Sequence, residues 1–170
     1  MSVESLFLKF SVDELRQQAG RIEACLAKLS DDQIWARGGE NENAIGNLAL
    51  HLAGNVRQWI ISSIGGIQFE RDRDAEFAAR GGATKTELST RLRSTVEEAS
   101  RVIRNLTTGQ LTQTYPIQGY QPSGIEAVYH VVEHFSYHTG QIIFATKMLT
   151  GDDLAFYRHL SNPQHNERVP

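Results

Sequence analysis

The chain lacks several features that would place it outside the ordinary globular proteins. It has a single cysteine, Cys25, so no disulfide can form within the chain, and export to an oxidising compartment is not indicated. No apolar stretch approaches the roughly 18 residues that a membrane-spanning helix needs. The first residues, MSVESLFLKF, lack the basic segment followed by a long apolar stretch that is typical of a signal peptide. These absences predict a cytoplasmic protein with no membrane partner.

A surplus of positive charge is also missing. Lys and Arg number 17 against 20 Asp and Glu, which gives a formal net charge of −3. Nucleic-acid binding depends strongly on basic side chains that neutralise phosphates. The composition therefore predicts no nucleic-acid partner.

The chain does contain enough apolar material for one core. It has 170 residues, and 40% of them are hydrophobic. This length is typical of one domain, so we expect residues 1–170 to form a single domain.

Apolar residues recur at helical spacing in four places and predict four long helices. The series are Leu15, Ile22, Leu26 and Leu29; Leu48, Leu52, Val56, Trp59 and Ile60; Leu88, Leu92, Val96, Ala99, Ile103 and Leu106; and Val128, Val131, Val132, Phe135, Ile142 and Leu149. Capping-box patterns, Ser or Thr followed three residues later by Glu or Gln, occur at Ser11, Ser30, Thr84 and Ser123. Asn43 is a candidate cap for the second helix, and Gly151 is expected to end the fourth. The first helix could begin near Val3 or near Ser11.

Strand signals are weak, and two stretches are typical of long connections. Residues 114–122, TYPIQGYQP, contain β-formers but are broken by two prolines and a glycine. Residues 65–83 are densely charged, and the tail after Gly151 is polar and expected to be loose. We therefore predict an all-α fold, an antiparallel four-helix bundle with two long connections.

Three of the six histidines lie at four-residue spacing in EAVYHVVEHFSYHTGQ: His130, His134 and His138. On a helix, each such step advances roughly 6 Å and turns about 40° past one full turn. Two neighbouring rings can therefore hold one metal ion, but three converge poorly on a single point. At most two of these histidines should bind the same ion.

A further ligand is available in NLALHLAGNVRQW, where His51 shares a stripe with Asn47, Asn55 and Trp59. Two histidines from one helix and His51 from another would form an open three-histidine site. Hydrogen-bonded core histidines explain the same residues, and no HExxH pattern is present. Spacing alone leaves both readings open.

The paired segments NLALHLAGNVRQW and HVVEHFSYHTGQI resemble the DinB-like superfamily, which includes YfiT-like metal-dependent hydrolases and bacillithiol and mycothiol S-transferases. RDRDAEF and GDDLAFY resemble one bacterial branch of it. The resemblance implies a bundle in up-down-down-up order, a divalent metal held by His51, His134 and His138, and a homodimer. Where this family usually has a basic residue after the last histidine, this chain has Thr139.

Other residues are candidates around such a site. His130 is the candidate acid–base group, and the commoner role for such a residue is a capped, hydrogen-bonded histidine. Asn55 could bind a ligand ring or a substrate. The charged run from Glu70 to Glu76 is expected to be solvated, and the alternative is that Arg71 or Arg73 binds a carboxylate of a thiol cofactor.

The favoured function is thiol S-transfer to a small electrophilic substrate, with a low-molecular-weight thiol as cosubstrate. Zn²⁺ is the expected metal, and Ni²⁺, Mn²⁺ or Fe²⁺ would also accept imidazole ligands. The alternatives are a metal-dependent hydrolase and a non-catalytic metal- or ligand-binding stress protein. The apolar run WIISSIGGI at 59–67 is longer than one buried stripe requires, which also predicts an interface between two copies.

Overall fold

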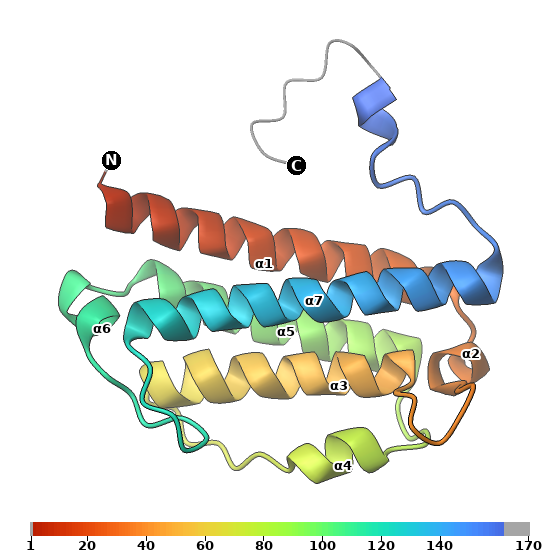
Figure 1. Ribbon diagram of the computed structural model, residues 1–170, viewed down its shortest axis with the longest axis horizontal. Helices are drawn as coiled ribbons and strands as arrows, with labels where there is room; N and C mark the ends of the chain where they lie inside the picture. Colours follow the sequence, from red (N-terminus) through yellow and green to blue (C-terminus); the bar gives the residue numbers. More distant parts are fainter. Residues whose placement is uncertain (1, 162–170) are drawn as a thin grey trace.

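The computed structural model describes residues 2–161, and every regular element in that range is helical. Four long helices lie side by side: α1 (Val3–Lys28), α3 (Ile45–Val56), α5 (Lys85–Arg104) and α7 (Gly124–Thr150) (Figure 1). A π-helical segment, η1 (Arg57–Ile64), continues α3. The predicted all-α four-helix bundle is confirmed. Of the polar tail predicted after Gly151, residues 162–170 lie outside the described part.

The four long helices form two pairs that run in opposite directions. In Figure 1, α1 and α7 run in one direction, whereas α3 and α5 run in the other. Ion pairs agree with this order, because Arg16 with Glu97 and Glu23 with Arg93 join α1 to α5 in opposite senses. Lys28 Nζ lies 2.9 Å from an Asp152 carboxylate oxygen, which brings the ends of α1 and α7 together. Helices α3 and α7 are therefore antiparallel neighbours.

Each connection between long helices contains a short helix. These are α2 (Asp31–Trp35), α4 (Arg73–Ala78) and α6 (Thr108–Thr112), and η2 (Arg158–Ser161) follows α7. The two predicted long connections are present, and the connection between α1 and α3 is long as well. Trp35 ties it to the rest, because its Nε1 donates to the carbonyl of Ala83 at 2.9 Å and its ring packs where Gly46 has no side chain.

The helix caps follow local sequence patterns with two exceptions. Reciprocal capping boxes form at Ser30, Thr84 and Ser123 as predicted. The pattern at Ser11 caps nothing, because α1 already begins at Val3, and the Ser11 hydroxyl donates to the carbonyl of Phe7 within the helix. Ala44, not Asn43, precedes α3, and the side chain of Asn47 accepts from the backbone N–H of Ala44 at 3.0 Å.

The core is made of the predicted apolar series. Its largest fully buried side chains include Leu15, Ile22, Leu52, Leu92 and Phe135, which come from all four long helices. Cys25 is buried among them, and burial raises the pKa of its thiol, which agrees with an inert core residue.

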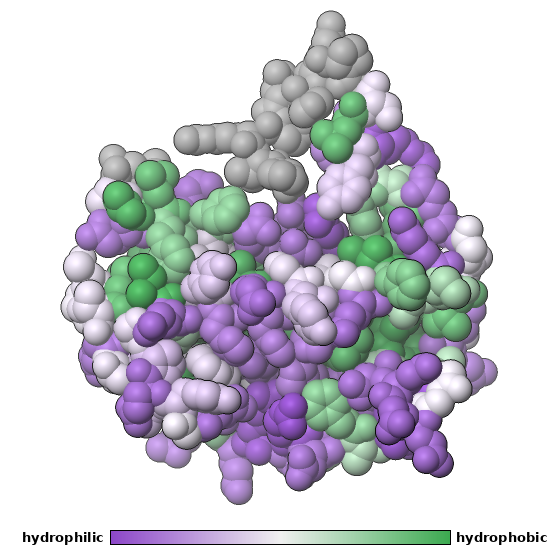
Figure 2. Space-filling view, in the orientation of Figure 1, coloured by the Kyte–Doolittle hydropathy of each residue, from purple (hydrophilic) through white to green (hydrophobic). Residues whose placement is uncertain are grey.

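The segment 59–67 does not provide the exposed apolar surface that the sequence suggested. Trp59, Ile60, Ile61 and Ile64 are all buried, and only Ile67 is exposed among its large apolar residues. The segment continues the enclosed helix α3, and these large apolar side chains belong to the core. Exposed apolar side chains lie instead along α1 and α7 (Val3, Leu6, Phe10, Tyr129, Tyr137, Phe144 and Met148). Figure 2 shows apolar patches near the beginning of α1 and near the end of α7.

No helix within residues 2–161 is long and apolar enough to cross a membrane.

Candidate metal centre

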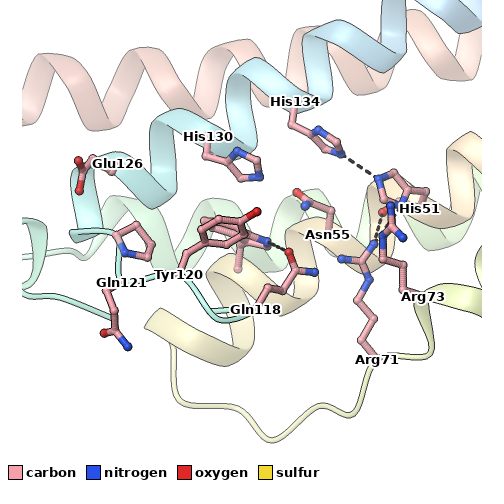
Figure 3. Close-up of a pocket in the computed structure, with 12 residues that line it drawn as sticks. His51, Asn55, Arg71, Arg73, Gln118, Tyr120, Gln121, Glu126, His130 and His134 are labelled. Atoms are coloured by element: carbon pink, nitrogen blue, oxygen red, sulfur yellow. Dashed lines mark hydrogen bonds between the residues drawn. The ribbon is translucent and has the colours of Figure 1, made fainter. Parts of the chain in front are cut away.

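Three histidines from two helices converge at one point. His51 comes from α3, and His134 and His138 come from α7, one helical turn apart. One ring nitrogen of each lies within 4.8 Å of those of the other two. The Nε2 atoms of His51 and His134 are 2.9 Å apart and face each other (Figure 3). With metal–nitrogen bonds of about 2.0–2.1 Å, one ion could contact both. The structure thus brings together the three residues that the sequence singled out.

Two of the rings have a hydrogen-bond partner on Nδ1. Nδ1 of His51 lies 3.1 Å from Oε2 of Glu76, and Nδ1 of His138 lies 2.7 Å from Oε1 of Gln141. Such partners are typical of metal-binding histidines, because they orient the ring and direct the other nitrogen towards the ion. Gln141 therefore orients the ring of His138.

The site favours neutral rings. Burial, together with the nearby His138, His51, His130 and Arg71, lowers the pKa of His134 to about 3. Burial also lowers the pKa of His138, although its hydrogen bond with Gln141 opposes the shift. A neutral imidazole is the form that binds a metal, so these rings are ready as ligands at neutral pH.

A buried ion pair from the 65–84 connection lies against His51. Nε and Nη2 of Arg71 donate to the two carboxylate oxygens of Glu76, at 2.7 Å each. The side chains of Arg71 and Glu76 are only 3% and 12% exposed. Burial alone would raise the pKa of Glu76, but the hydrogen bonds from His51 and Arg71 outweigh it and lower the pKa. The expectation that this charged run is solvated is therefore wrong for these two residues.

A cavity of about 610 Å³ opens beside the histidines. His51 and His134 lie at one end, Trp59 and His130 form a wall, and the loop that contains Gln118 and Tyr120 covers it (Figure 3). The cavity is large enough for a small organic molecule.

His130 lies beside the three histidines but outside their cluster. Its ring packs on Trp59, with centroids 4.0 Å apart, and stacks with His134 at 5.4 Å. Burial lowers its pKa, and the charge of Glu133 opposes this shift. His130 therefore presents a neutral ring to the cavity, where it could accept a proton.

Asn55 has an unused polar atom in the cavity wall. It lies one helical turn after His51 and is 4% exposed. Its Oδ1 is buried and has no hydrogen-bond partner within residues 2–161. Figure 3 shows its side chain pointing towards the space between the histidines and Gln118. Buried polar atoms normally have partners, so Asn55 is suited to a donor group on a bound molecule.

Of the two arginines that the sequence suggested for binding a carboxylate, Arg73 is the more exposed to solvent. Its side chain is exposed at the cavity, and its guanidinium lies 4.9 Å from the centre of the Phe77 ring. The Phe77 ring in turn contacts His51, with ring centroids 4.6 Å apart. The guanidinium of Arg71 is already used by Glu76, by the carbonyl of His51 and by Gln58.

Sequence reasoning missed Glu76 and Gln118. Gln118 and Gly119 have φ of 53° and 82° and form the tip of a tight turn between Ile117 and Tyr120. This turn directs Gln118 into the site, where its Oε1 accepts from Nε1 of Trp59 at 3.3 Å. The dipeptide Gln-Gly within a run of β-formers was the available signal, since two successive left-handed residues favour glycine at the second.

The chain matches the family described as "Protein of unknown function (DUF1572)" over residues 2–166. A conserved protein from Enterococcus faecalis has a similar structure, with a TM-score of 0.70 and 15% identity over 89% of this chain and 99% of that one. A DinB-like protein, YjoA, from Bacillus subtilis gives 0.65 and 18% over 86% and 96%. A DinB-like protein from Bacillus cereus gives 0.62 and 15% over 78% and 85%.

No curated protein matches the chain. At identities of 15–18%, the similarity to these solved structures establishes the fold alone. The family match covers nearly the whole chain. The protein therefore belongs to the DUF1572 family and has the fold of the DinB-like superfamily.

Proposed function

We propose that the protein is a divalent-metal-dependent enzyme that transfers a low-molecular-weight thiol to a small electrophile. The observation that carries the proposal is the convergence of three histidine nitrogens, within 4.8 Å of one another, beside an open cavity. His51, His134 and His138 would hold the metal. Zn²⁺ fits three imidazoles and an open position, and Ni²⁺, Mn²⁺ or Fe²⁺ would also accept these ligands.

A bound divalent metal supplies positive charge that acidifies a thiol next to it. Neutral histidine ligands leave that charge intact, and the low pKa of His134 keeps its ring neutral. The environment of the three rings therefore supports thiol activation. It would equally support activation of water, which is the hydrolase alternative.

His130 is the candidate proton acceptor. Its pKa is lowered by burial, so the ring is neutral at pH 7 and one ring nitrogen can accept the thiol proton. In the proposed reaction, a carbon–sulfur bond forms and the carbon–halogen bond of an alkyl or aryl halide breaks. The halide leaves, and the proton passes from the thiol to His130 and then to water.

Arg73 and Asn55 are the candidate binding residues for the thiol. An exposed guanidinium at the cavity suits the carboxylate that small biological thiols carry. The unpaired Oδ1 of Asn55 suits an ammonium or amide donor on the same molecule. Because Arg71 is paired with Glu76, we assign it a supporting role rather than direct contact with the thiol.

The test is turnover of 1-chloro-2,4-dinitrobenzene by the zinc-loaded protein, with and without L-cysteine. We expect thiol-dependent release of chloride above the spontaneous rate, which His51→Ala abolishes. His159→Ala is the matched control, because His159 lies in η2, beyond the end of α7 (Figure 1). Equal rates for wild type and His51→Ala, with several thiols, would contradict the transferase proposal. Hydrolysis of a nitrophenyl ester without thiol would favour the hydrolase instead.

His130→Ala separates the two roles of the histidines. We expect this variant to keep its zinc but to lose roughly 10²–10⁴-fold in turnover, the range typical of a general base. Loss of stoichiometric zinc from this variant would show that His130 is a ligand.

A further inference from the structure

The buried pair of Arg71 and Glu76 has a contact that an ordinary structural ion pair does not need. Glu76 uses both carboxylate oxygens for Arg71, and its Oε2 also lies 3.1 Å from Nδ1 of His51. A buried ion pair is weak evidence for a gain in stability, because removing two charges from water is costly. The contact with His51 suggests a role at the three histidines.

The hydrogen-bond partners of His51 decide which of its ring nitrogens carries the proton. Nη2 of Arg71 lies 3.0 Å from Nδ1 of His51, so either Arg71 or the ring could be the donor there. Nη2 carries two hydrogens, and these are used by Oε2 of Glu76 at 2.7 Å and by the carbonyl of His51 at 3.2 Å. Oε2 of Glu76 belongs to a carboxylate whose pKa is lowered and can only accept, so its 3.1 Å contact with Nδ1 of His51 requires the proton to be on Nδ1. The lone pair of this ring is therefore on Nε2, which faces His134.

The backbone is shaped to admit this carboxylate. A Cβ atom at Gly54 would lie 1.9 Å from Oε1 of Glu76 and 2.9 Å from Nε of Arg71. Glycine at this position, one turn after His51, leaves the space that the ion pair fills. Any other residue would push Glu76 away from α3.

The backbone carbonyl of Glu76 is also held by a hydrogen bond. Nδ2 of Asn47 donates to the carbonyl of Glu76 at 2.8 Å and to that of Ala79 at 2.9 Å. Nη2 of Arg37 donates to the same Ala79 carbonyl at 3.0 Å and to Oδ1 of Asn47. Two separate segments thus fix the last turn of α4, and with it the position of the Glu76 backbone.

We propose that Glu76, held by Arg71, is a positioning residue that fixes His51 with its proton on Nδ1 and its lone pair directed towards His134 and His138. The pair thereby sets the affinity of the three-histidine site for a divalent metal. This inference rests on the proposed function only in requiring that a metal binds there. It makes the 65–84 connection part of the metal site, although that connection contributes no ligand.

Glu76→Gln is the sharpest test because it keeps the shape and removes one acceptor. An amide oxygen facing His51 turns the amide N–H₂ towards Arg71, and the opposite orientation turns N–H₂ towards Nδ1, so one contact is lost either way. Glu98→Gln is the matched control. Glu98 accepts from Nη1 of Arg57 at 3.2 Å, in a more exposed pair that joins η1 to α5 away from the three histidines.

The measurements are zinc affinity, by competition with a chromogenic chelator at pH 7.5, and the tautomer of His51, by ¹⁵N NMR of the metal-free protein. We expect Glu76→Gln to weaken zinc binding about 10–100-fold, as loss of such partners typically does, and Glu98→Gln to leave it unchanged. Wild-type His51 should be protonated on Nδ1, and Glu76→Gln should populate the other tautomer.

If Glu76→Gln fails to fold, Glu76→Asp replaces it, since the shorter side chain keeps the charge near Arg71 but withdraws it from His51. Equal zinc affinity in wild type and either folded variant would overturn the positioning role while leaving the metal centre intact. A wild-type His51 protonated on Nε2 would overturn it too. Absence of zinc binding by the wild type would overturn the proposed function itself.

Discussion

Helices α3 and α7 both contribute histidines to the candidate metal centre, yet their surroundings differ greatly. Every residue of α3 except Leu50 is buried, whereas α7 buries one face and exposes the other. Small residues make the enclosure of α3 possible, since Gly46 admits the ring of Trp35 and Gly54 admits Glu76. The outer face of α7 instead presents large side chains such as Tyr137 and Phe144.

This difference extends to how the histidines are supported. His51 on α3 contacts a buried charged pair, whereas His138 on α7 has a hydrogen bond with the neutral amide of Gln141. The lesson is that one ligand is fixed by tertiary contacts from a distant connection and the other two by the geometry of a single helix. Substitutions that remove the contacts of His51 should therefore destabilise the protein more than substitutions that remove the contacts of His138.

The largest expected effect is that of Glu76→Ala. It leaves the guanidinium of Arg71 buried without its carboxylate, and breaking a buried pair in this way typically costs about 3–5 kcal/mol of stability. Gln141→Ala, the matched change on α7, should cost at most about 1.5 kcal/mol, the usual contribution of one hydrogen bond. Urea denaturation of both variants measures the difference. Equal losses would mean that the two helices are supported alike.

The second prediction compares the change in stability caused by Gly→Ala at two positions, one on α3 and one on α7. Gly54→Ala must displace Glu76 or Arg71 and should destabilise the fold by about 1–3 kcal/mol, as overpacking does. Gly140→Ala on α7 meets no atom within 4 Å and should be neutral or stabilising by up to about 1 kcal/mol, because alanine favours a helix. Thermal melts of the metal-free variants distinguish them. A stable Gly54→Ala variant would contradict the account of the enclosed α3.

The α7 histidines predict a pH-dependent effect on stability. Burial and the neighbouring His138, His51, His130 and Arg71 lower the pKa of His134 from its ordinary 6.5 to about 3. Between these values the unfolded chain binds more protons than the folded one, so stability rises with pH. The contribution is fully present above pH 6.5 and is lost as pH falls towards 3. Burial lowers the pKa of His130 and His138 as well, which acts in the same direction.

Urea denaturation of the metal-free protein between pH 7.5 and pH 4 measures this dependence. His134→Gln should flatten the profile because it removes the most strongly shifted group, and His159→Ala should preserve it. A profile that is unchanged in His134→Gln would show that other groups dominate the acid response.

Helical spacing predicted that two histidines of the series 130, 134 and 138 could act together but left a metal site open, and the resemblance to the DinB-like superfamily selected His51, His134 and His138. Glu76 was not predictable, since its neighbours Asp72 and Asp74 look alike in the sequence and are exposed. What buries Glu76 is the gap at Gly54 and the hydrogen bonds of Asn47, and these come from another part of the chain. A charged run shows where charges lie but not which of them a tertiary contact will cover.

The four long helices were predictable because apolar periodicity and capping patterns are local. The π-helical turn of η1 was not, because no residue pattern in 57–64 distinguishes it from an α-helix. The expectation for 59–67 was wrong because the four large apolar residues before Ile67 are buried in the core, and burial by distant helices is not visible in a local pattern. The start of α1 was left open for a similar reason, since both Ser2 and Ser11 are possible caps and only packing selects between them.

The exposed face of α7 gives the last prediction, which concerns two copies of the chain rather than the stability of one. We propose that the protein pairs through α1 and α7, where Val3, Phe10, Phe144 and Met148 are exposed. A two-fold axis could place the apolar patch near the beginning of α1 against the patch near the end of α7 of the partner (Figure 2).

Phe144→Ser should change the stability of the monomer by less than about 0.5 kcal/mol, as surface substitutions usually do, but should shift a dimer towards monomer. Light scattering at micromolar concentration measures the mass, and Ile67→Ser, an exposed residue of the segment 59–67, is the control that should leave the dimer intact. A monomeric wild type, or a dimer that Ile67→Ser disrupts and Phe144→Ser does not, would contradict pairing through this face.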